Sequence, residues 1–275
     1  MENLKINKNI LEETLGIVAE KLGAPAKNTI LFENCGKHLF EIKTILENTR
    51  NGKLLDIGGG LGVNFFCLHN LKKNNFKFTL IDRFEEYNDS NRMGSFNSAA
   101  NLIKEANINI VNQNFWQNKI LPFQDNYFDL VSILDVTEHL PGNPLYLLKE
   151  TCRILKPEGI LFLGGPNSVS FLKRIMMFFG RNPYINLETW LDDKYFFHYR
   201  EYSKHEQEEL IKLSNLKLIK TYMLAEPSNT QAKYRFYYDE KKKLSIKTMI
   251  LYLMDIAERL IPNLRSTVYC VAKKY

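Results

Sequence analysis

Residues 54–66 read LLDIGGGLGVNFF, and this stretch decides the fold. An apolar run ends at Asp56, four glycines follow within five positions, and apolar residues then return in close succession. Where a strand turns into a helix, glycine lets the backbone approach a ligand closely, and the first N–H groups of the helix face it. The stretch therefore predicts a ligand-binding turn at the end of a buried strand.

Strands and helices alternate on both sides of this turn. The predicted strands are 53–57, 76–82, 108–113, 127–134, 156–166, 216–223 and 267–274. The predicted helices between them are about 62–72, 97–106, 144–155, 204–214 and 245–260, and Ser203 with Glu206 forms a capping box before the fourth. Apolar strands that alternate with helices are typical of a parallel sheet covered on both faces. We predict an α/β fold with a doubly wound, Rossmann-like, mostly parallel sheet of seven strands.

Two further helical patterns, over 9–22 and roughly 28–48, precede the first strand. They predict an N-terminal helical cap over 1–50 in front of a main domain over 51–275. Within the main domain, residues 166–202 interrupt the alternation and predict a substrate lid. Residues 226–243 are polar and predict a variable loop.

Composition excludes several classes of protein. A net charge of +6 over 275 residues is mildly basic and evenly spread, so it does not indicate nucleic-acid binding. The four cysteines lie far apart without a CxxC motif, which favours reduced thiols in a cytoplasmic protein over disulfides or a zinc site. The first residues do not resemble a signal peptide, and no apolar run approaches the roughly 20 residues that span a bilayer.

The glycine turn differs from the common nucleotide motifs. The dinucleotide fingerprint requires glycine where this chain has Val63, and no Gly-Lys-Ser/Thr follows to form a phosphate-binding P-loop. Asp82 ends the second predicted strand, 20 residues after Gly62. A carboxylate at that place can accept hydrogen bonds from both hydroxyls of a ribose. The residues therefore predict a nucleoside ligand without a phosphate partner.

Five motifs in order give residues 53–165 a resemblance to the class I S-adenosylmethionine-dependent methyltransferases of types 11 and 23. They are DIGGGLG (56–62), TLIDR (79–83), LPFQDNYFDLV (121–131), DVTEHLP (135–141) and ILKPEGILFLGGPN (154–167). The resemblance implies S-adenosylmethionine as cofactor and S-adenosylhomocysteine as product. The alternative is a doubly wound domain with a chance glycine turn.

The resemblance also implies a role for each site residue. Asp56 and the glycine backbone would hold the amino acid end of the cofactor, Asp82 the ribose, Arg83 and residues 114–115 the adenine, and Asp135 the sulfonium side. Asn114 stands where the family often has aspartate, which is a departure from the pattern. The full set of implied cofactor-binding residues is Asp56, Gly58, Gly59, Gly60, Gly62, Asp82, Arg83, Asn114, Phe115 and Asp135.

Three residues are candidates for catalysis, because a hydroxyl acceptor must lose its proton. Glu138 and His139 resemble the Glu-His pair of the ubiquinone O-methyltransferases. His198, in HYREYS (198–203), resembles a segment that covers the cofactor pocket. The alternatives are that the Glu-His pair only holds its loop and that His198 only packs among aromatic residues. No metal ligand is predicted, and a divalent metal is the less favoured reading of the pair.

The acceptor is less well marked. Pro166-Asn167, Arg174 and GRNP (180–183) resemble methyltransferases encoded with bacterial surface-polysaccharide genes, which implies the hydroxyl of a nucleotide-linked or lipid-linked sugar. Aromatic side chains within 184–202 suit sugar faces. The alternatives are an isoprenoid quinone or another small-molecule O- or N-acceptor, and a non-catalytic, cofactor-binding partner subunit. A nucleic-acid acceptor is not expected, because no N/D-P-P-Y/F motif follows the fourth strand.

Two amphipathic stretches bear on the partners of the chain. SFLKRIMMFF (170–179) and TMILYLMDIAERLIP (248–262) mix apolar faces with cations. This pattern is compatible with peripheral contact with a membrane or a lipid-linked substrate. The favoured reading is that these helices pack on the core or in a homodimer interface.

Overall fold

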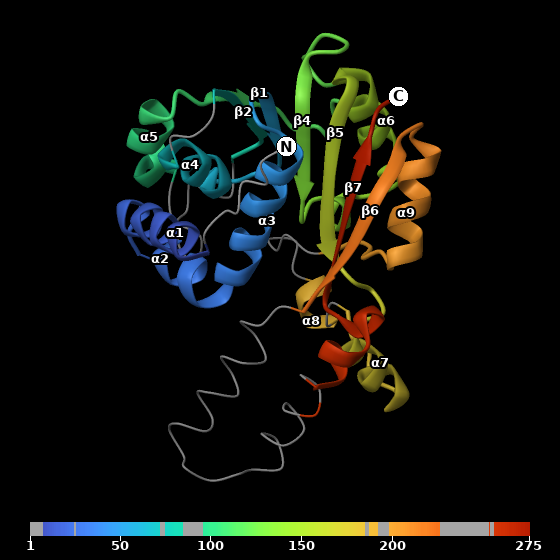
Figure 1. The fold of residues 1–275 in the computed structure, drawn as a ribbon. Helices are drawn as coiled ribbons and strands as arrows, with labels where there is room; N and C mark the ends of the chain where they lie inside the picture. The colour runs from blue at the N-terminus through green and yellow to red at the C-terminus, as the bar shows by residue number, and fades with distance from the viewer. Residues whose placement is uncertain are drawn as a thin grey trace.

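The computed structural model describes residues 8–24, 26–71, 75–84, 96–184, 187–191, 198–225, 253 and 256–275. One seven-stranded sheet forms its centre, in the order β3-β2-β1-β4-β5-β7-β6 (Figure 1). The strands are β1 (Gly52–Ile57), β2 (Phe76–Asp82), β3 (Asn109–Asn112), β4 (Phe128–Leu134), β5 (Leu155–Pro166), β6 (Lys217–Leu224) and β7 (Thr267–Lys273). Strands β1 to β5 pair in parallel, and β7 runs antiparallel between β5 and β6. The predicted doubly wound, mostly parallel sheet is confirmed.

The sheet has a separate apolar core on each face. Successive strand residues enter different cores: Leu54 and Leu130 lie in the first, while Leu55 and Val131 lie in the second. Because both faces are buried, the strands read as continuous apolar runs in the sequence. The first face is covered by α4 (Val63–Asn70) and α5 (Phe96–Glu105), and the second by α6 (Leu145–Ile154) and α9 (Lys204–Leu213) (Figure 1).

The N-terminal helices pack on the first face. Helix α1 (Lys8–Leu22) contacts α4 and α5, and its buried Leu15 and Val18 belong to the same core as Phe65 of α4. The single helix predicted over 28–48 is wrong. The chain forms α2 (Ala26–Asn28), a π-helical turn η1 (Thr29–Glu33) and α3 (Cys35–Asn48), with a break at Asn34 (φ −119°, ψ 8°). Asparagine and the following Gly36 are poor residues for a helix interior, which accounts for the break. The division into domains at residue 50 stays a prediction.

Short elements complete the described chain. They are the 3₁₀ turns η3 (Thr137–His139) and η4 (Pro262–Leu264) and the helices α7 (Phe171–Phe178) and α8 (Leu187–Trp190). The predicted capping box of α9 is confirmed, since Ser203 Oγ accepts from the Glu206 N–H and the Glu206 carboxylate accepts from the Ser203 N–H. Residues 185–186 and 192–197 of the predicted lid lie outside the described residues. So do the predicted loop 226–243 and most of the helix predicted over 245–260.

Cys35, Cys67, Cys152 and Cys270 all carry free thiols. In the described part of the chain, no helix is both long and apolar enough to cross a bilayer.

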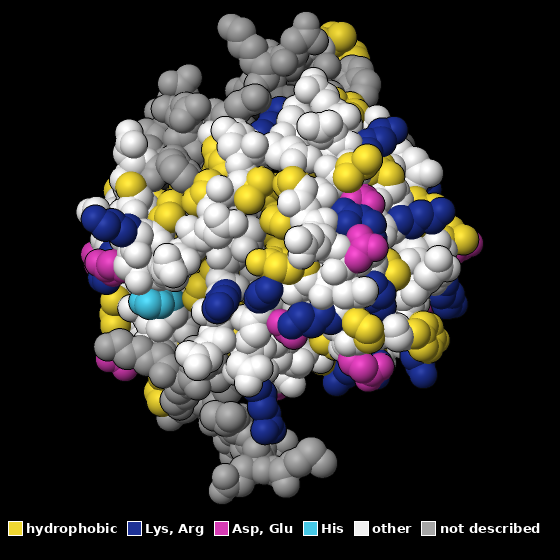
Figure 2. All heavy atoms as spheres, turned by 90° about the horizontal axis from the view of Figure 1, so that it is seen from above, with side chains coloured by type: hydrophobic (Ala, Val, Ile, Leu, Met, Phe, Trp, Pro, Cys, Tyr) yellow, Lys and Arg dark blue, Asp and Glu magenta, His cyan; other side chains and the backbone are white. Residues whose placement is uncertain are grey.

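Charges of both signs are interleaved at the end of the molecule seen from above in Figure 2. At this end, near the amino ends of the parallel strands, Lys156 Nζ lies 2.7 Å from Asp129 Oδ1 and Lys273 Nζ lies 2.6 Å from Glu158 Oε2. Some of the cations on this face are therefore paired with neighbouring carboxylates.

Candidate functional site

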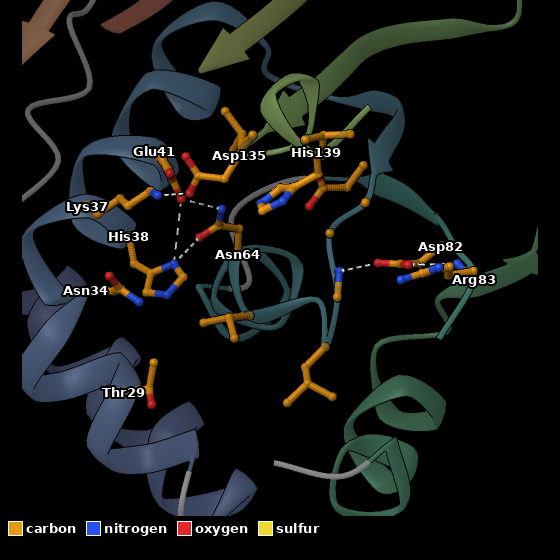
Figure 3. A pocket seen from close by; sticks show the side chains of 18 of the residues that line it. Thr29, Asn34, Lys37, His38, Glu41, Asn64, Asp82, Arg83, Asp135 and His139 are labelled. Atoms are coloured by element: carbon orange, nitrogen blue, oxygen red, sulfur yellow. Dashed lines mark hydrogen bonds and ion pairs between the residues drawn. The ribbon is translucent and has the colours of Figure 1, made fainter. Parts of the chain in front are cut away.

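A cavity of about 320 Å³ lies at the carboxyl ends of β1 to β4. In Figure 3, side chains of α3 form one wall, Asp82 and Arg83 lie on the opposite side, and His139 enters between them. The lining residues are Ala26, Thr29, Ile30, Asn34, Lys37, His38, Glu41, Asp56, Gly58, Gly59, Gly60, Leu61, Val63, Asn64, Asp82, Arg83, Gln113, Asn114, Phe115, Trp116, Leu134, Asp135, Val136 and His139. In doubly wound folds this edge of the sheet is where ligands bind.

The glycine turn forms its wall from bare backbone. Gly58 has φ +70°, and a Cβ there would lie 2.5 Å from Val136 Cγ2. A Cβ on Gly59 would lie 2.3 Å from Asp56 Oδ2. Gly60 also lines the cavity, whereas Gly62 (φ +79°) is the N-cap of α4 and does not. Side chains at these positions would clash or be strained, so the turn leaves its backbone open to a ligand.

Asp56 is buried at the end of β1. Its Oδ1 accepts a hydrogen bond of 2.7 Å from Ser132 Oγ on β4. Burial raises the pKa of Asp56 to about 7, against the lowering effect of the Ser132 hydrogen bond, and the charges of Glu41 and Asp82 raise it further. A carboxyl group in this state gains most from a cationic partner.

Asp82 ends β2 with its carboxylate held by backbone. Oδ2 accepts from Gly60 N at 3.1 Å and Oδ1 accepts from Arg83 N at 2.7 Å. The Arg83 guanidinium lies over the ring of Trp116, 4.7 Å from its centroid. Trp116 was not among the predicted site residues, although it directly follows Asn114 and Phe115, which were.

Asn114 and Phe115 both line the cavity, as their predicted role requires. The Asn114 amide oxygen accepts from the backbone N–H groups of Trp116 at 3.1 Å and Gln117 at 3.3 Å. The Phe115 side chain is buried, and its carbonyl accepts from Tyr146 Oη at 3.0 Å. These bonds fix the turn after β3 as one apolar edge of the cavity.

The wall formed by α3 is polar, and none of its residues was predicted from the sequence. His38 Nδ1 lies 3.0 Å from Asn64 Oδ1, and Asn64 Nδ2 donates to Glu41 Oε2 at 2.8 Å (Figure 3). On the other side, Tyr269 Oη of β7 donates to Glu41 Oε1 at 2.9 Å. Burial acts to raise the pKa of Glu41, but the interactions with His38, Lys37 and Asn64 outweigh it and hold the pKa below its usual value. The sequence places Lys37, His38 and Glu41 on one predicted helix but does not indicate which element that helix meets.

Glu41→Ala is expected to destabilise the protein by about 2–6 kcal/mol, because it removes the carboxylate acceptor of two buried donors, Asn64 Nδ2 and Tyr269 Oη, at about 1–3 kcal/mol each. Since the pKa of Glu41 in the folded state lies below its usual value of 4.5, its contribution to stability is complete above pH 4.5 and is lost progressively as the pH falls below 4.5. Thermal unfolding at pH 7 and at pH 4 measures both effects. The matched control is Glu105→Ala, which removes an exposed ion pair with Lys21 and should change Tm little. Equal Tm losses in the two variants would contradict the prediction.

Lys37 also reaches across the cavity to the turn after β4, where it forms an ion pair with Asp135. Asp135 has φ +53°, a conformation that costs free energy for a residue other than glycine. The strained backbone turns the Asp135 carboxylate towards α3 (Figure 3). The N-terminal helices are thus joined to the ends of the strands by charge as well as by packing.

The three catalytic candidates lie together. Glu138, His139 and His198 place potential ligand atoms within 4.8 Å of one another, and the two imidazole centroids are 4.6 Å apart with ring planes at 79°. Only His139 lines the cavity. Glu138 lies behind it with 1% of its surface exposed, and neither carboxylate oxygen has a hydrogen-bond partner within the described residues. Burial raises the pKa of Glu138 to about 7, while Lys37 and Lys173 act to lower it.

His198 is oriented by a carboxylate of its own. Its Nδ1 lies 2.9 Å from Glu201 Oε1, and Glu201 also pairs with Lys173. This partner favours the tautomer with the proton on Nδ1, which leaves Nε2 as an acceptor. Burial, followed by the charges of Lys173 and Lys37, lowers the pKa of His198 below 6.5. The ring is therefore neutral at pH 7 and can accept a proton.

Comparison with known proteins shows the family to which the chain belongs. The model of a methyltransferase domain family matches residues 35–221, which include the α3 wall, the glycine turn and the cluster of Glu138, His139 and His198. No curated protein matches the chain in sequence.

Solved structures match over nearly the whole chain. The complex of the Haloferax volcanii methyltransferase activator Trm112 with a protein described as a methyltransferase has a TM-score of 0.55 at 15% identity, covering 93% of this chain and 96% of that one. A SAM-dependent methyltransferase from Thermotoga maritima has a TM-score of 0.52 at 18% identity, covering 95% and 100%. A phosphoethanolamine N-methyltransferase from Haemonchus contortus, bound to phosphomonomethylethanolamine and S-adenosylhomocysteine, has a TM-score of 0.52 at 15% identity, covering 86% and 52%. At these identities the structures share the fold.

Proposed function

We propose a function for this chain from the premise that it belongs to the class I S-adenosylmethionine-dependent methyltransferases. The proposal is that it methylates a hydroxyl of a small molecule, most of all a sugar in surface-glycan biosynthesis. One observation supports S-adenosylmethionine as the methyl donor. A glycine-walled cavity lies between two strand ends that carry acids, Asp56 and Asp82.

The residues around the cavity fit S-adenosylmethionine. Asp56 would hold its ammonium, the backbone of Gly58, Gly59 and Gly60 its amino acid end, and Asp82 its ribose hydroxyls. Phe115 would pack on the adenine between Asn114 and Arg83, with Asp135 on the sulfonium side, while Gly62 acts through the start of α4. The cofactor supplies an electrophilic methyl group on a good leaving group, so the protein mainly aligns the acceptor and keeps water out.

Binding of S-adenosylmethionine is expected to tighten as the pH rises towards 7 and to level off above it. The raised pKa of Asp56, about 7, means that its carboxyl group must lose a proton to pair with the ammonium. Calorimetry in buffers of different ionisation enthalpy should detect this released proton below pH 7. Asp56→Asn should bind more weakly and without the pH dependence.

The same group has a linked effect on stability. Because the pKa of Asp56 is higher in the folded state than its usual value of 3.8, the unliganded protein loses stability as the pH rises from 3.8 to about 7. Asp56→Asn should therefore raise the Tm of the unliganded protein at pH 8. A variant that lowers Tm at pH 8 and keeps the pH dependence of binding would contradict both expectations.

Support for a sugar acceptor comes from the resemblance of residues 166–183 to surface-polysaccharide methyltransferases. In the described part of the lid, Arg174 and Arg181 are exposed and suit a diphosphate linker. An isoprenoid quinone or another small-molecule acceptor is the second candidate, and a non-catalytic subunit is the third. A screen of nucleotide sugars, lipid-linked sugars and quinols, read as the mass shift of one methyl group, separates them. Binding of S-adenosylmethionine without any methylated product would favour the non-catalytic subunit.

The cluster of Glu138, His139 and His198 carries a second proposal, which the sequence did not favour. One carboxylate and two imidazoles within 4.8 Å, with the Glu138 oxygens lacking partners among the described residues, could hold a divalent cation such as Mn²⁺ or Zn²⁺. A cation there would supply Lewis acidity to an acceptor hydroxyl. The two imidazoles would then be ligands instead of bases.

Metal binding is tested without an activity assay. Titration of Mn²⁺ into chelator-treated protein, followed by electron paramagnetic resonance, should show a site that Glu138→Gln and His198→Ala each weaken by at least about tenfold. His205→Ala, an exposed histidine of α9, is the matched control and should bind normally. Absence of Mn²⁺ binding, or equal binding in Glu138→Gln, would contradict the metal site.

The remaining expectations are proposals of the same kind. We place the enzyme in the cytoplasm from its unpaired thiols, and a homodimer stays a prediction.

A further inference from the structure

Helix α7 exposes large apolar side chains instead of burying them. None of its eight residues is buried. Leu172 is 50% exposed, Met177 46% and Phe178 83%, and the next residue, Phe179, is 70% exposed. A surface helix normally turns such residues to the core, and exposed apolar patches of this kind mark interaction sites.

The helix belongs to a larger apolar end of the molecule. Asn167, just before α7, donates hydrogen bonds to the carbonyls of Asn263 and Arg265. This ties the start of α7 to the turn after Ile261, which is itself 52% exposed. In Figure 1, α7, α8 and this turn all lie below the carboxyl ends of the parallel strands. We define the α7 face as Leu172, Ile175, Met177, Phe178, Phe179 and Ile261.

Cations surround this face. Among the described residues of 171–191 and 256–265, the exposed charged side chains are Arg174, Arg181 and Arg259 against the single acid Glu188. Exposed apolar residues flanked by arginines are the pattern of elements that lie in a membrane interface, where apolar side chains enter the headgroup region and cations meet anionic lipids.

A chain of contacts connects the α7 face to the cavity. Lys173 is the inward side chain of α7, 16% exposed, and it pairs with Glu201 and donates to the carbonyl of Asn167. Glu201 holds His198, whose ring lies against His139 in the cavity. The surface helix is therefore built onto the same histidines that are candidates for catalysis.

We propose that the α7 face docks onto the surface of a bilayer that contains anionic lipids. Docking in this orientation turns the part of the cavity next to His139 and His198 towards the lipid headgroups. The acceptor would then be a molecule held in the membrane, such as a lipid-linked sugar. The statement about the acceptor rests on the proposed function, whereas the docking does not.

Vesicle flotation with the full chain tests the docking. The protein should float with vesicles of phosphatidylcholine mixed with phosphatidylglycerol, and less with phosphatidylcholine alone or at high salt. Phe178→Ser with Phe179→Ser should reduce the vesicle-bound fraction by at least about tenfold, because both rings lose their apolar burial. Arg174→Gln with Arg181→Gln should reduce binding to the anionic vesicles. The control is Leu213→Ser, which replaces an apolar side chain that is 53% exposed on α9. This variant should bind vesicles as the wild type does.

Three outcomes would overturn the docking. The first is that the wild type binds S-adenosylmethionine but no vesicles. The second is that the double phenylalanine variant binds vesicles as well as the wild type does. The third is that the wild type binds no vesicles but forms a dimer in light scattering, and that the variant is a monomer. The last would make the face an interface between two copies. Vesicle binding by a protein that does not bind S-adenosylmethionine would support the docking and contradict the proposed function. Because Phe178 and Phe179 are exposed, cofactor binding by the variant also serves as the check that it folds.

Discussion

Asp82→Ala is expected to weaken the binding of S-adenosylmethionine by about a hundredfold. A carboxylate that accepts both ribose hydroxyls makes two hydrogen bonds to a charged group, each worth about 1.5–3 kcal/mol. Loss of about 3 kcal/mol corresponds to a factor of about 100 in the dissociation constant. Isothermal titration calorimetry with S-adenosylmethionine and S-adenosylhomocysteine measures the change directly.

Asp82 also has a structural role that the experiment must separate. Its carboxylate accepts from Gly60 N and Arg83 N, so alanine also removes two contacts of the glycine turn. Asp82→Asn keeps one oxygen acceptor and loses the charge, so its affinity for S-adenosylmethionine and its Tm should both fall between those of the alanine variant and the wild type. Asp125→Ala, which changes an exposed acid paired with Arg153, is the control for charge alone. Wild-type affinity in Asp82→Ala would contradict the role of Asp82 in binding the ribose. It would also contradict the proposal that the cavity binds S-adenosylmethionine.

The second large effect concerns the two histidines. With an acceptor identified by the screen, replacing the catalytic histidine, His139 or His198, by alanine should lower kcat by at least about a hundredfold, since a positioned base contributes about 10² to 10⁴. The affinity for S-adenosylmethionine should stay nearly unchanged, because neither residue is assigned to the cofactor. His205→Ala, on the solvent side of α9, should have wild-type kcat.

The pH profile distinguishes the two histidines. The pKa of His198 is lowered from 6.5 by burial and by Lys173 and Lys37, so if His198 is the base, kcat should fall only below pH 6.5. Glu201→Gln should shift the pH at which kcat falls and should lower kcat, because Glu201 orients the His198 ring through Nδ1. Unchanged kcat in both His139→Ala and His198→Ala would exclude a histidine base and leave alignment alone as the source of the rate.

The sheet could be predicted closely because its strands are buried on both faces. Strand β2, for example, was predicted as 76–82 and observed as Phe76–Asp82. Burial on both faces makes the inner strands apolar runs, and the polar residue near the end of such a run lies at the edge of the sheet where ligands bind. Asp56 and Asp82 were found in this way.

The α3 wall could not be predicted by the same means. Lys37, His38 and Glu41 belong to a helix that looks amphipathic and ordinary in the sequence, and the break at Asn34 was missed. Their partners, Asp135, Asn64 and Tyr269, lie in other elements, and Tyr269 is almost at the other end of the chain. Local periodicity carries no information about which distant element a helix will meet.

The sequence by itself determined the class of sheet, the glycine turn and the acids at two strand ends, because these depend on burial patterns and backbone freedom within a few residues. The tertiary structure alone decided that α3 closes the cavity, that His139 and His198 lie in contact, and that Glu138 is buried without a partner among the described residues. Those features depend on how packing between separate elements orders side chains far apart in the chain. For the same reason the face of α7 that is exposed, and its connection through Lys173 to the histidines, emerged only from the fold.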